Sequence, residues 1–453
     1  MIYLDHAATS PMPAAVRGAY LAALEVQGNP SSIHSAGQRA RAMVDDARVR
    51  IAATLGVEAI EVTFTGGGTE AVNLAVKGMF WARNAGASSS GGAPSAPPAS
   101  SPSTDRVSSS TGARSHGTRS RRRILVPRAE HHATLDAVEW LAQHEGAELN
   151  WLDVDELGAL RLDHLAEALG DGSDVALLTM LAANNEVGTL QPVAQAAALA
   201  AAVGVPVHVD AIAAYGQVRL DPLPQGVSAV SISAHKVGGP VGVGALVLRR
   251  GAEVVPLLHG GSQQRGRSGT MDAAGAEAFA VAAELAHAEL DERAAHKTAL
   301  RERLAEGIRR WVPQAVLSGA AGSIARATND AHTGDAAHAS GGRIDTTALD
   351  ALALPGTLHF TVPGAEGDSL LMLLDAAGFA VSTGSACQAG VPEPSHVLLA
   401  MGFSEADARG ALRVTLGPAT TVDEIDALLA ALPAAVERAL SAGLAAQVPR
   451  LGR

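Results

Sequence analysis

Hydrophobic runs separated by polar breaks predict strands that alternate with helices along the first half of the chain. Short β-branched or leucine-rich runs at 124–126, 149–152 and 175–181 have the length and composition of buried strands. Between such runs, apolar residues at three- and four-residue spacing predict helices, for example over 133–144 and 193–202. Strands that alternate with helices form a mostly parallel sheet covered on both faces. The expected fold class is therefore α/β.

The C-terminal part of the chain has a different pattern, which predicts a second and smaller domain. Residues 276–312 are expected to form one long helix that leads out of the first sheet. The shorter apolar runs beyond it lie at 357–362, 370–377, 395–401, 411–416 and 422–440. These runs favour an α+β domain. We predict a large domain over 14–290 and a small domain made of 1–13 and 291–453.

Two segments interrupt these patterns and are predicted to be disordered insertions. Residues 84–120 are rich in Ser, Gly, Ala and Pro and show no apolar periodicity. Residues 319–343 are rich in Gly, Ala, His and Ser, again with weak periodicity. Such compositions bury too little apolar surface to offset the entropy of folding. The basic run at 119–123 is interpreted as a solvated flank, because the whole chain carries a formal net charge of −12.

Composition narrows the function classes. A chain of 453 residues that is 47% hydrophobic has enough apolar residues for a large core. Its acidic balance and 3% aromatic content argue against direct nucleic-acid binding. No run approaches the ~20 apolar residues of a membrane span, and no secretion signal opens the sequence. We therefore expect a cytoplasmic protein. The single cysteine, Cys387, excludes an internal disulfide, and no metal site is expected.

The candidate chemistry lies at strand ends, where α/β sheets bind ligands. Lys236 follows the first of two apolar strands within 227–247, at a polar break before a glycine-rich turn. The chain has only three lysines, and an amine, unlike a guanidinium, can form a Schiff base. Asp210 directly follows another apolar run, 205–209. A buried acid needs a cation or hydrogen-bond donors, although Asp210 could instead cap the next segment.

A glycine turn completes the pattern. Gly66–Thr69 lies between an expected strand and a helix, where backbone N–H groups can approach a phosphate. The turn matches neither common nucleotide motif and could be a plain tight turn. Lys236, Asp210 and this turn are nevertheless the three parts needed to hold pyridoxal phosphate, through its aldehyde, ring nitrogen and phosphate. The small polar neighbours of Cys387 favour an exposed reactive thiol over a core residue.

The ordered motifs of the sequence resemble those of the cysteine desulfurases. This family belongs to the class V aminotransferase superfamily, which has the type I pyridoxal-phosphate transferase fold. The matching segments are Tyr3–Thr9, Gly68–Glu70, Glu130–His131, Asn184–Glu186, His208–Ala211, Ser233–Lys236, Arg267–Thr270, Gly384–Cys387 and Arg413–Gly417. The resemblance extends from residue 3 to about 430. The loop at 381–391 resembles the branch with a longer cysteine loop.

The resemblance implies an activity and a set of site residues. It implies that L-cysteine is converted to L-alanine and that the sulfur, held as a persulfide on Cys387, passes to an acceptor protein for iron–sulfur cluster or thio-tRNA synthesis. The implied catalytic residues are Cys387, Lys236 and His131. The implied cofactor-binding residues are Lys236, Asp210, Thr69, Gly68, Ser233, His235, Thr270 and Asn185. The substrate carboxylate would meet Arg413 and Asn185, and Thr270 would come from the partner subunit of a homodimer.

One position departs from the family pattern. The family usually has a glutamine three residues after the aspartate, bonded to the cofactor's ring oxygen, and this chain has Ala213. A missing donor would weaken the hold on the cofactor or change its titration. Two other functions stay open. A selenocysteine lyase or other class V enzyme would be recognised by comparing the two amino acids as substrates. A weakly active homologue that binds an acceptor or scaffold protein would be purified without the cofactor's chromophore.

Overall fold

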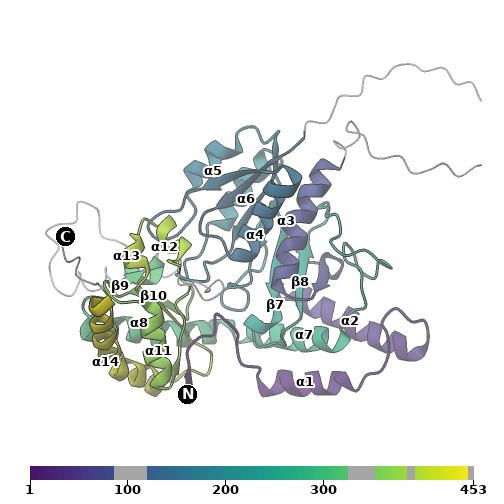
Figure 1. The fold of residues 1–453 in the computed structure, drawn as a ribbon. Coiled ribbons are helices and arrows are strands. Elements are labelled where there is room, and N and C mark those ends of the chain that lie inside the picture. The colour runs from purple at the N-terminus through teal and green to yellow at the C-terminus, as the bar shows by residue number, and fades with distance from the viewer. Residues whose placement is uncertain (86–119, 325–351, 385–392, 447–453) are drawn as a thin grey trace, which may run out of the picture.

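The computed structural model describes residues 1–85, 120–324, 352–384 and 393–446, and a seven-stranded sheet is its largest element (Figure 1). In order across the sheet, the strands are β2 (Val62–Thr65), β8 (Gly244–Leu248), β7 (Val227–Ser233), β6 (Val207–Asp210), β5 (Val175–Leu181), β3 (Arg123–Pro127) and β4 (Glu148–Leu152). All are parallel except β8, which runs antiparallel to both of its neighbours. The predicted α/β class is confirmed.

Helices cover both faces of this sheet because both faces are apolar. On one face the apolar core is shared with α2 (Ser35–Ala53), α5 (Leu162–Leu169), α6 (Val193–Ala202) and α7 (Ala273–Ala288). Helix α1 (Ala14–Leu24) packs on α7, and Figure 1 shows α1, α2 and α7 together along this side. The opposite face packs against α3 (Gly68–Asn84) and α4 (His132–Glu145). A sheet buried on both faces is typical of parallel α/β folds.

Parallel strands end at the same edge of a sheet, and this edge collects the polar residues singled out above. Strand β2 leads into Gly68, β5 is followed by the Asn185 loop, and β6 ends at Asp210. Strand β7 passes into a short 3-10 turn, Ala234–Lys236, which places Lys236 at the same edge.

A three-stranded antiparallel sheet forms a second centre of packing. Its strands are, in order, β12 (Ala411–Thr415), β10 (Thr357–Thr361) and β9 (Val316–Ser318). The surrounding helices are α8 (Leu290–Trp311), α11 (Gly367–Ala376), α12 (His396–Ala400), α13 (Glu405–Ala408) and α14 (Val422–Ala446). Near the N-terminus, β1 (Ile2–Tyr3) pairs with β11 (Phe379–Ala380), and Leu4 joins the apolar core of this sheet. The first residues of the chain therefore pack with its C-terminal third.

Two expectations about the C-terminal part are wrong. The helix predicted over 276–312 is broken at Glu289, where φ and ψ leave the helical region. No glycine or proline marks this break, because it is imposed by packing: α7 covers the large sheet, whereas α8 packs into the core of the small one. The predicted insertion at 319–343 begins later, since Ala320, Ala321 and Ile324 are buried in that core. Residues 325–343 lie outside the described residues.

None of the helices in the described segments is both long and apolar enough to cross a membrane. The longest, α14 and α8, carry charged residues along their exposed sides. Apolar residues of the described segments are instead packed into the interior cores.

Asn84 contacts both ends of the segment that connects α3 to β3. Its side-chain amide donates to the Arg121 carbonyl at 2.9 Å and accepts from the Arg121 N–H at 2.9 Å. It also accepts from the Ser120 hydroxyl at 3.3 Å. Residues 86–119, which contain most of the predicted first insertion, lie outside the described residues. These contacts of Asn84 hold the described residues on either side close together.

We predict that deletion of residues 86–118 leaves the fold and turnover intact. The Asn84 contacts already bring the two ends together, and shortening a surface connection costs little loop entropy. Far-UV circular dichroism and thermal unfolding would measure the effect, with an Asn84→Ala variant of the full-length protein as the comparison. Loss of cooperative unfolding in the deletion variant would show that the segment is part of the fold.

Candidate active site

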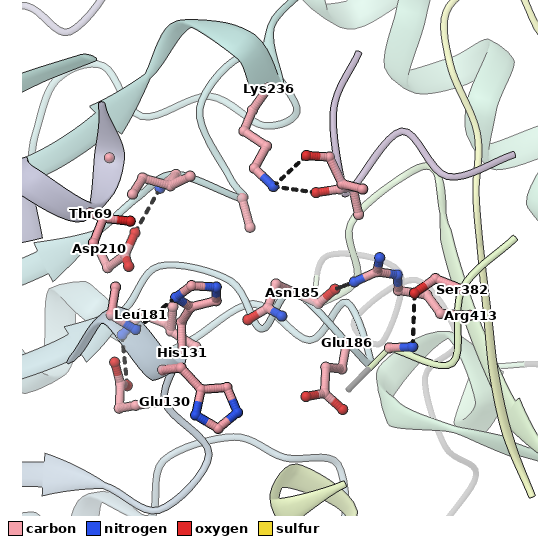
Figure 2. Close-up of a pocket in the computed structure, with 18 of the residues that line it drawn as sticks. Thr69, Glu130, His131, Leu181, Asn185, Glu186, Asp210, Lys236, Ser382 and Arg413 are labelled. Carbon is pink, nitrogen blue, oxygen red and sulfur yellow. Dashed lines mark hydrogen bonds between the residues drawn. The ribbon is translucent and has the colours of Figure 1, made fainter. Parts of the chain in front are cut away.

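A cavity of about 380 Å³ lies at the polar edge of the large sheet and reaches the small sheet (Figure 2). Most of the residues predicted from the sequence line this cavity: Gly68, Thr69, His131, Asn185, Asp210, His235, Lys236 and Arg413. They come from the ends of five strands of the large sheet (β2, β3, β5, β6 and β7) or the segments that follow them, and from β12 of the small sheet. A pocket of this size accommodates a cofactor together with a small substrate.

Three predicted residues do not line the cavity. Ser233, the last residue of β7, is buried beneath the start of α3. Thr270 is exposed and lies outside the cavity of its own chain, so its role toward a partner subunit stays a prediction. Cys387 lies outside the described residues. Ala213, the departure from the family pattern, does line the cavity.

Lys236 points its amine toward the N-terminal segment. Its Nζ donates hydrogen bonds to the carbonyl oxygens of Ala7 and Ala8, the second at 3.1 Å (Figure 2). The pKa of Lys236 is lowered to about 8. Burial is the largest cause and the positive charge of Arg413 adds to it, whereas Asp5 and Asp210 act in the opposite direction. A larger fraction of the amine is therefore neutral near pH 7 than in an exposed lysine.

Asp210 ends β6 with its side chain only 2% exposed. One carboxylate oxygen accepts a hydrogen bond from the Ile212 N–H at 3.0 Å. Burial raises the pKa of Asp210 to about 6, whereas this hydrogen bond and the charge of Lys236 lower it. A cationic ring nitrogen beside this carboxylate would stabilise its charged form. The pair of Asp210 and Lys236 thus fits the two ends of a pyridoxal ring.

The start of α3 has the features of an anion site. No side chain caps Gly67–Gly68, and Glu70 in the first turn is paired with Arg267 at 2.9 Å. The Ser233 hydroxyl is buried with no hydrogen-bond partner. A Cβ at Gly68 would lie 2.3 Å from Cδ1 of Ile212, so a larger residue would need that side chain to shift. Free helical N–H groups beside an unpaired hydroxyl fit a phosphate.

His131 and His132 both line the cavity. His131 precedes α4 as its N-cap, with Nδ1 accepting from the Ala133 N–H at 3.1 Å. Burial lowers the pKa of His131 to about 4, and the positive charge of Lys236 adds to this shift. His131 is therefore neutral at physiological pH. Within the described segments, no group of side chains is arranged to hold a metal ion.

Arg413 is held by groups on both sides of the cavity. It is 5% exposed, and its Nη1 donates to the Asn185 carbonyl at 2.8 Å. Its Nη2 donates to the Asp5 carboxylate at 2.9 Å. The backbone of Arg413 pairs with that of Ser382, two residues before the last described residue of the cysteine loop. The guanidinium keeps further N–H donors for a bound carboxylate.

Glu186, His396 and Asp5 also contribute to this site, although the sequence alone gives them no role. Glu186 lines the cavity and is buried, with its carboxylate accepting from the Ser395 hydroxyl. His396, from α12, lines the cavity and bonds through Nε2 to the Glu130 carbonyl at 2.8 Å. Asp5 holds Arg413. Glu186 and Asp5 lie within matched motifs, but no spacing signal connects His396 to a partner 266 positions away.

Comparisons with known proteins agree with this geometry. The model of the family "Aminotransferase class-V" matches residues 2–88, 106–339 and 339–428. The IscS-like cysteine desulfurase of Mycobacterium tuberculosis is 45% identical over 447 residues, which cover 98% of this chain and 99% of that protein. The chain therefore belongs to the class-V aminotransferase family.

Solved structures with a similar fold include proteins related to cysteine desulfurases. A NifS-like protein superimposes with a TM-score of 0.76 and 28% identity, covering 96% of this chain and 99% of its own. A structure described as SspA in complex with cysteine gives a TM-score of 0.68 at 26% identity, covering 93% of this chain and all of the other. Within the family the chain is a cysteine desulfurase, and its cofactor is pyridoxal phosphate.

We predict that the rate at which cofactor-free protein takes up pyridoxal phosphate rises with pH and levels off above about pH 8. Only the neutral amine of Lys236 reacts with the aldehyde, and its lowered pKa brings the neutral form to a lower pH than in an ordinary lysine. Stopped-flow absorbance from pH 6 to 10 would measure the rate, with a free lysine derivative as the control. A rate that still rises tenfold per unit above pH 9 would contradict the prediction.

Proposed function

We propose that this chain releases L-alanine from L-cysteine and keeps the sulfur on Cys387 as a persulfide. The observation that carries the proposal is that Lys236, the buried carboxylate of Asp210 and Arg413 line one cavity. One residue serves the cofactor's aldehyde, one its ring nitrogen and one the substrate carboxylate. When bound, pyridoxal phosphate withdraws electrons from the α-carbon of the amino acid.

Residues at both ends of the cavity would hold the two molecules. Thr69, Ser233 and His235 would bind the phosphate at the start of α3, with Thr270 supplied by a partner subunit. Arg413 and Asn185 would bind the substrate carboxylate, and Asp5 would keep the guanidinium in place. A bidentate contact between guanidinium and carboxylate fixes orientation as well as position.

Lys236 and His131 would move protons at the substrate. Because burial brings the pKa of Lys236 to about 8, its amine exists in both protonation states near neutral pH, as a residue that takes and returns the α-proton requires. His131 is neutral and can stack on the cofactor ring or accept a proton. Both residues line the same cavity, so both can reach a substrate bound there without a movement of the backbone.

Cys387 would attack the sulfur of the bound cysteine as a thiolate. The new sulfur–sulfur bond forms as the carbon–sulfur bond of the substrate breaks, and the electron pair of that bond is protonated to give alanine. The cysteine lies five residues after Ser382, whose backbone pairs with Arg413 at the substrate end of the cavity. This pairing supports a loop that begins beside the substrate carboxylate.

The fate of the sulfur and the assembly state extend this proposal. We propose that an acceptor protein receives the sulfur for iron–sulfur cluster or thio-tRNA synthesis, and that the chain works as a cytoplasmic homodimer. The name of the Mycobacterium tuberculosis relative supports desulfuration, and the cysteine bound to SspA supports the substrate. The exposed position of Thr270 supports a contribution to a second subunit.

We predict that alanine release from L-cysteine, assayed with a thiol reductant, falls by more than about 100-fold in Cys387→Ala, because the nucleophile is lost. The absorbance of the bound cofactor should be unchanged in this variant. Equal alanine release by both proteins would remove Cys387 from the reaction. The absence of release by the cofactor-loaded wild type would point to another amino acid as substrate.

We also predict that Arg413→Lys raises the KM for L-cysteine about tenfold. Lysine keeps the positive charge but loses the bidentate contact, which costs roughly 1.4 kcal/mol for each factor of ten. Steady-state kinetics would measure the change, with the exposed Arg409→Lys as the matched control. If both variants have the same KM as the wild type, Arg413 does not bind the substrate carboxylate.

A further inference from the structure

A second, smaller cavity adjoins the active site at the end away from the phosphate-binding turn. Its volume is about 40 Å³, room for a few water molecules. The two cavities share Ala7, Asn185, Ala213 and Lys236, and the small one has neither Gly68 nor Thr69 in its walls. Its other walls include Gln217 and His6. Ala213 therefore stands where the active site opens into this space.

Gln217 and Ala213 both line the small cavity. The segment after β6 is folded into tight turns, in which the Tyr215 N–H donates to the Ala211 carbonyl at 2.8 Å and the Val218 N–H to the Ala214 carbonyl at 3.1 Å. Gly216 lies between the two positions with a φ of 70°, so this segment is not a continuous helix. The turns nevertheless bring Gln217 to the wall of the cavity that also contains Ala213, the position at which the family pattern has a glutamine.

The amide of Gln217 is held by a buried ammonium group. Lys297, on α8, is 2% exposed, and its Nζ donates to Oε1 of Gln217. In the described part of the chain this is the only acceptor of Lys297, and no carboxylate pairs with it. Gly356 leaves room for the lysine stem, since a Cβ there would lie 3.1 Å from its Cδ. Burial lowers the pKa of Lys297 to about 8, with a further effect of Arg293.

A buried cation that meets only a neutral amide is costly, because burial removes its hydration and no opposite charge replaces it. The contact nevertheless has a consequence for Gln217. Since Oε1 accepts from Lys297, the carbamoyl group is oriented and polarised, and its NH₂ group has no partner among the described residues. The nearby Nδ1 of His6 is likewise buried without a partner.

We propose that Gln217, oriented by Lys297, supplies the hydrogen bond to the cofactor's ring oxygen that Ala213 cannot supply. The proposal rests on the proposed function of the main cavity. In pyridoxal phosphate the ring oxygen neighbours the aldehyde carbon and lies on the side of the ring opposite the phosphate arm. With the aldehyde at Lys236 and the phosphate at Thr69, this oxygen would lie away from Thr69, on the side where the small cavity adjoins the active site. An anionic oxygen there also gives Lys297 the negative charge it lacks.

Other titratable groups around the small cavity contribute to the charge near the cofactor's ring oxygen. His6 faces it from the N-terminal segment, and burial lowers the pKa of His6 to about 4, with Lys297 as the next contribution and opposing effects of Asp5 and Glu424. Lys236 faces it from the turn after β7. His6 is neutral near pH 7, so Lys297 and Lys236 carry the titratable positive charge on this side.

The test is the pH at which the absorbance of the bound cofactor changes, measured on the cofactor-loaded protein. Gln217→Met removes the donor, and Lys297→Met removes the charge while keeping the stem. Each makes the ring oxygen more basic, so that it holds the proton shared with the nitrogen of Lys236 more tightly. We expect the midpoint to rise by about one pH unit, a tenfold change in proton affinity, in both variants.

Two further variants separate a hydrogen bond from a packing effect. Ala213→Gln combined with Gln217→Met supplies the donor from the neighbouring turn and should return the midpoint toward the wild-type value. Gln217→Glu, which cannot donate and adds a negative charge, should raise the midpoint further and keeps the buried contact with Lys297 if Gln217→Met fails to fold. The matched control is Lys77→Met, which removes a lysine of α3 that lies over the ring of Trp140 and should leave the midpoint unchanged.

Unchanged midpoints in Gln217→Met and Lys297→Met would overturn the proposal and leave Asn185, which lines both cavities, as the donor. A shift in only one of the two variants would overturn the pairing of Lys297 with Gln217. These outcomes differ from failure of the proposed function, in which the wild type would release no alanine from cysteine even though its cofactor titrates normally. The absorbance measurement does not depend on turnover.

Discussion

A lysine ammonium and an aspartate carboxylate share one poorly hydrated cavity, and the rest of the site depends on this arrangement. Burial disfavours the charged form of each group, lowering the pKa of Lys236 and raising that of Asp210. Each then partly restores the charge of the other. The pKa values of both groups are thus brought to about 8 and about 6, close to neutral pH. A cofactor that is cationic near Asp210 and accepts an amine at Lys236 completes the balance.

The parallel sheet provides the rigidity that this balance needs. Asp210 ends a fully buried strand and Lys236 follows another, so neither side chain depends on a long loop for its position. The substrate end is built differently. Arg413 comes from a separate antiparallel sheet, and its guanidinium bonds to the Asn185 carbonyl, in the loop after β5, and to Asp5 of the N-terminal segment. The cofactor end of the cavity therefore belongs to one unit of packing, and the substrate end lies between two.

The sequence predicted those parts of the fold that local composition determines. The runs at 175–181 and 193–202 match β5 and α6 to the residue, because a uniform apolar or alanine-rich stretch has clear ends. The break at Glu289 was missed, since nothing local opposes a continuous helix there and the two halves simply pack into different cores. The start of the second insertion was missed because buried alanines look like low-complexity sequence.

At the site, the same distinction holds between local and distant causes. Asp210 could be recognised because it directly follows an apolar run, and Lys236 because it lies in the polar break between two apolar strands. The contact between Gln217 and Lys297 joins residues 80 positions apart, and neither has unusual neighbours. The position of His396 likewise depends on how α12 packs against the large sheet. Such groups come together only through tertiary structure.

The first ten residues contact both sheets. Strand β1 is paired with β11 of the C-terminal part, Asp5 holds Arg413, and the carbonyls of Ala7 and Ala8 accept from Lys236. One short stretch of backbone therefore sets the positions of both the guanidinium at the substrate end and the amine at the cofactor end.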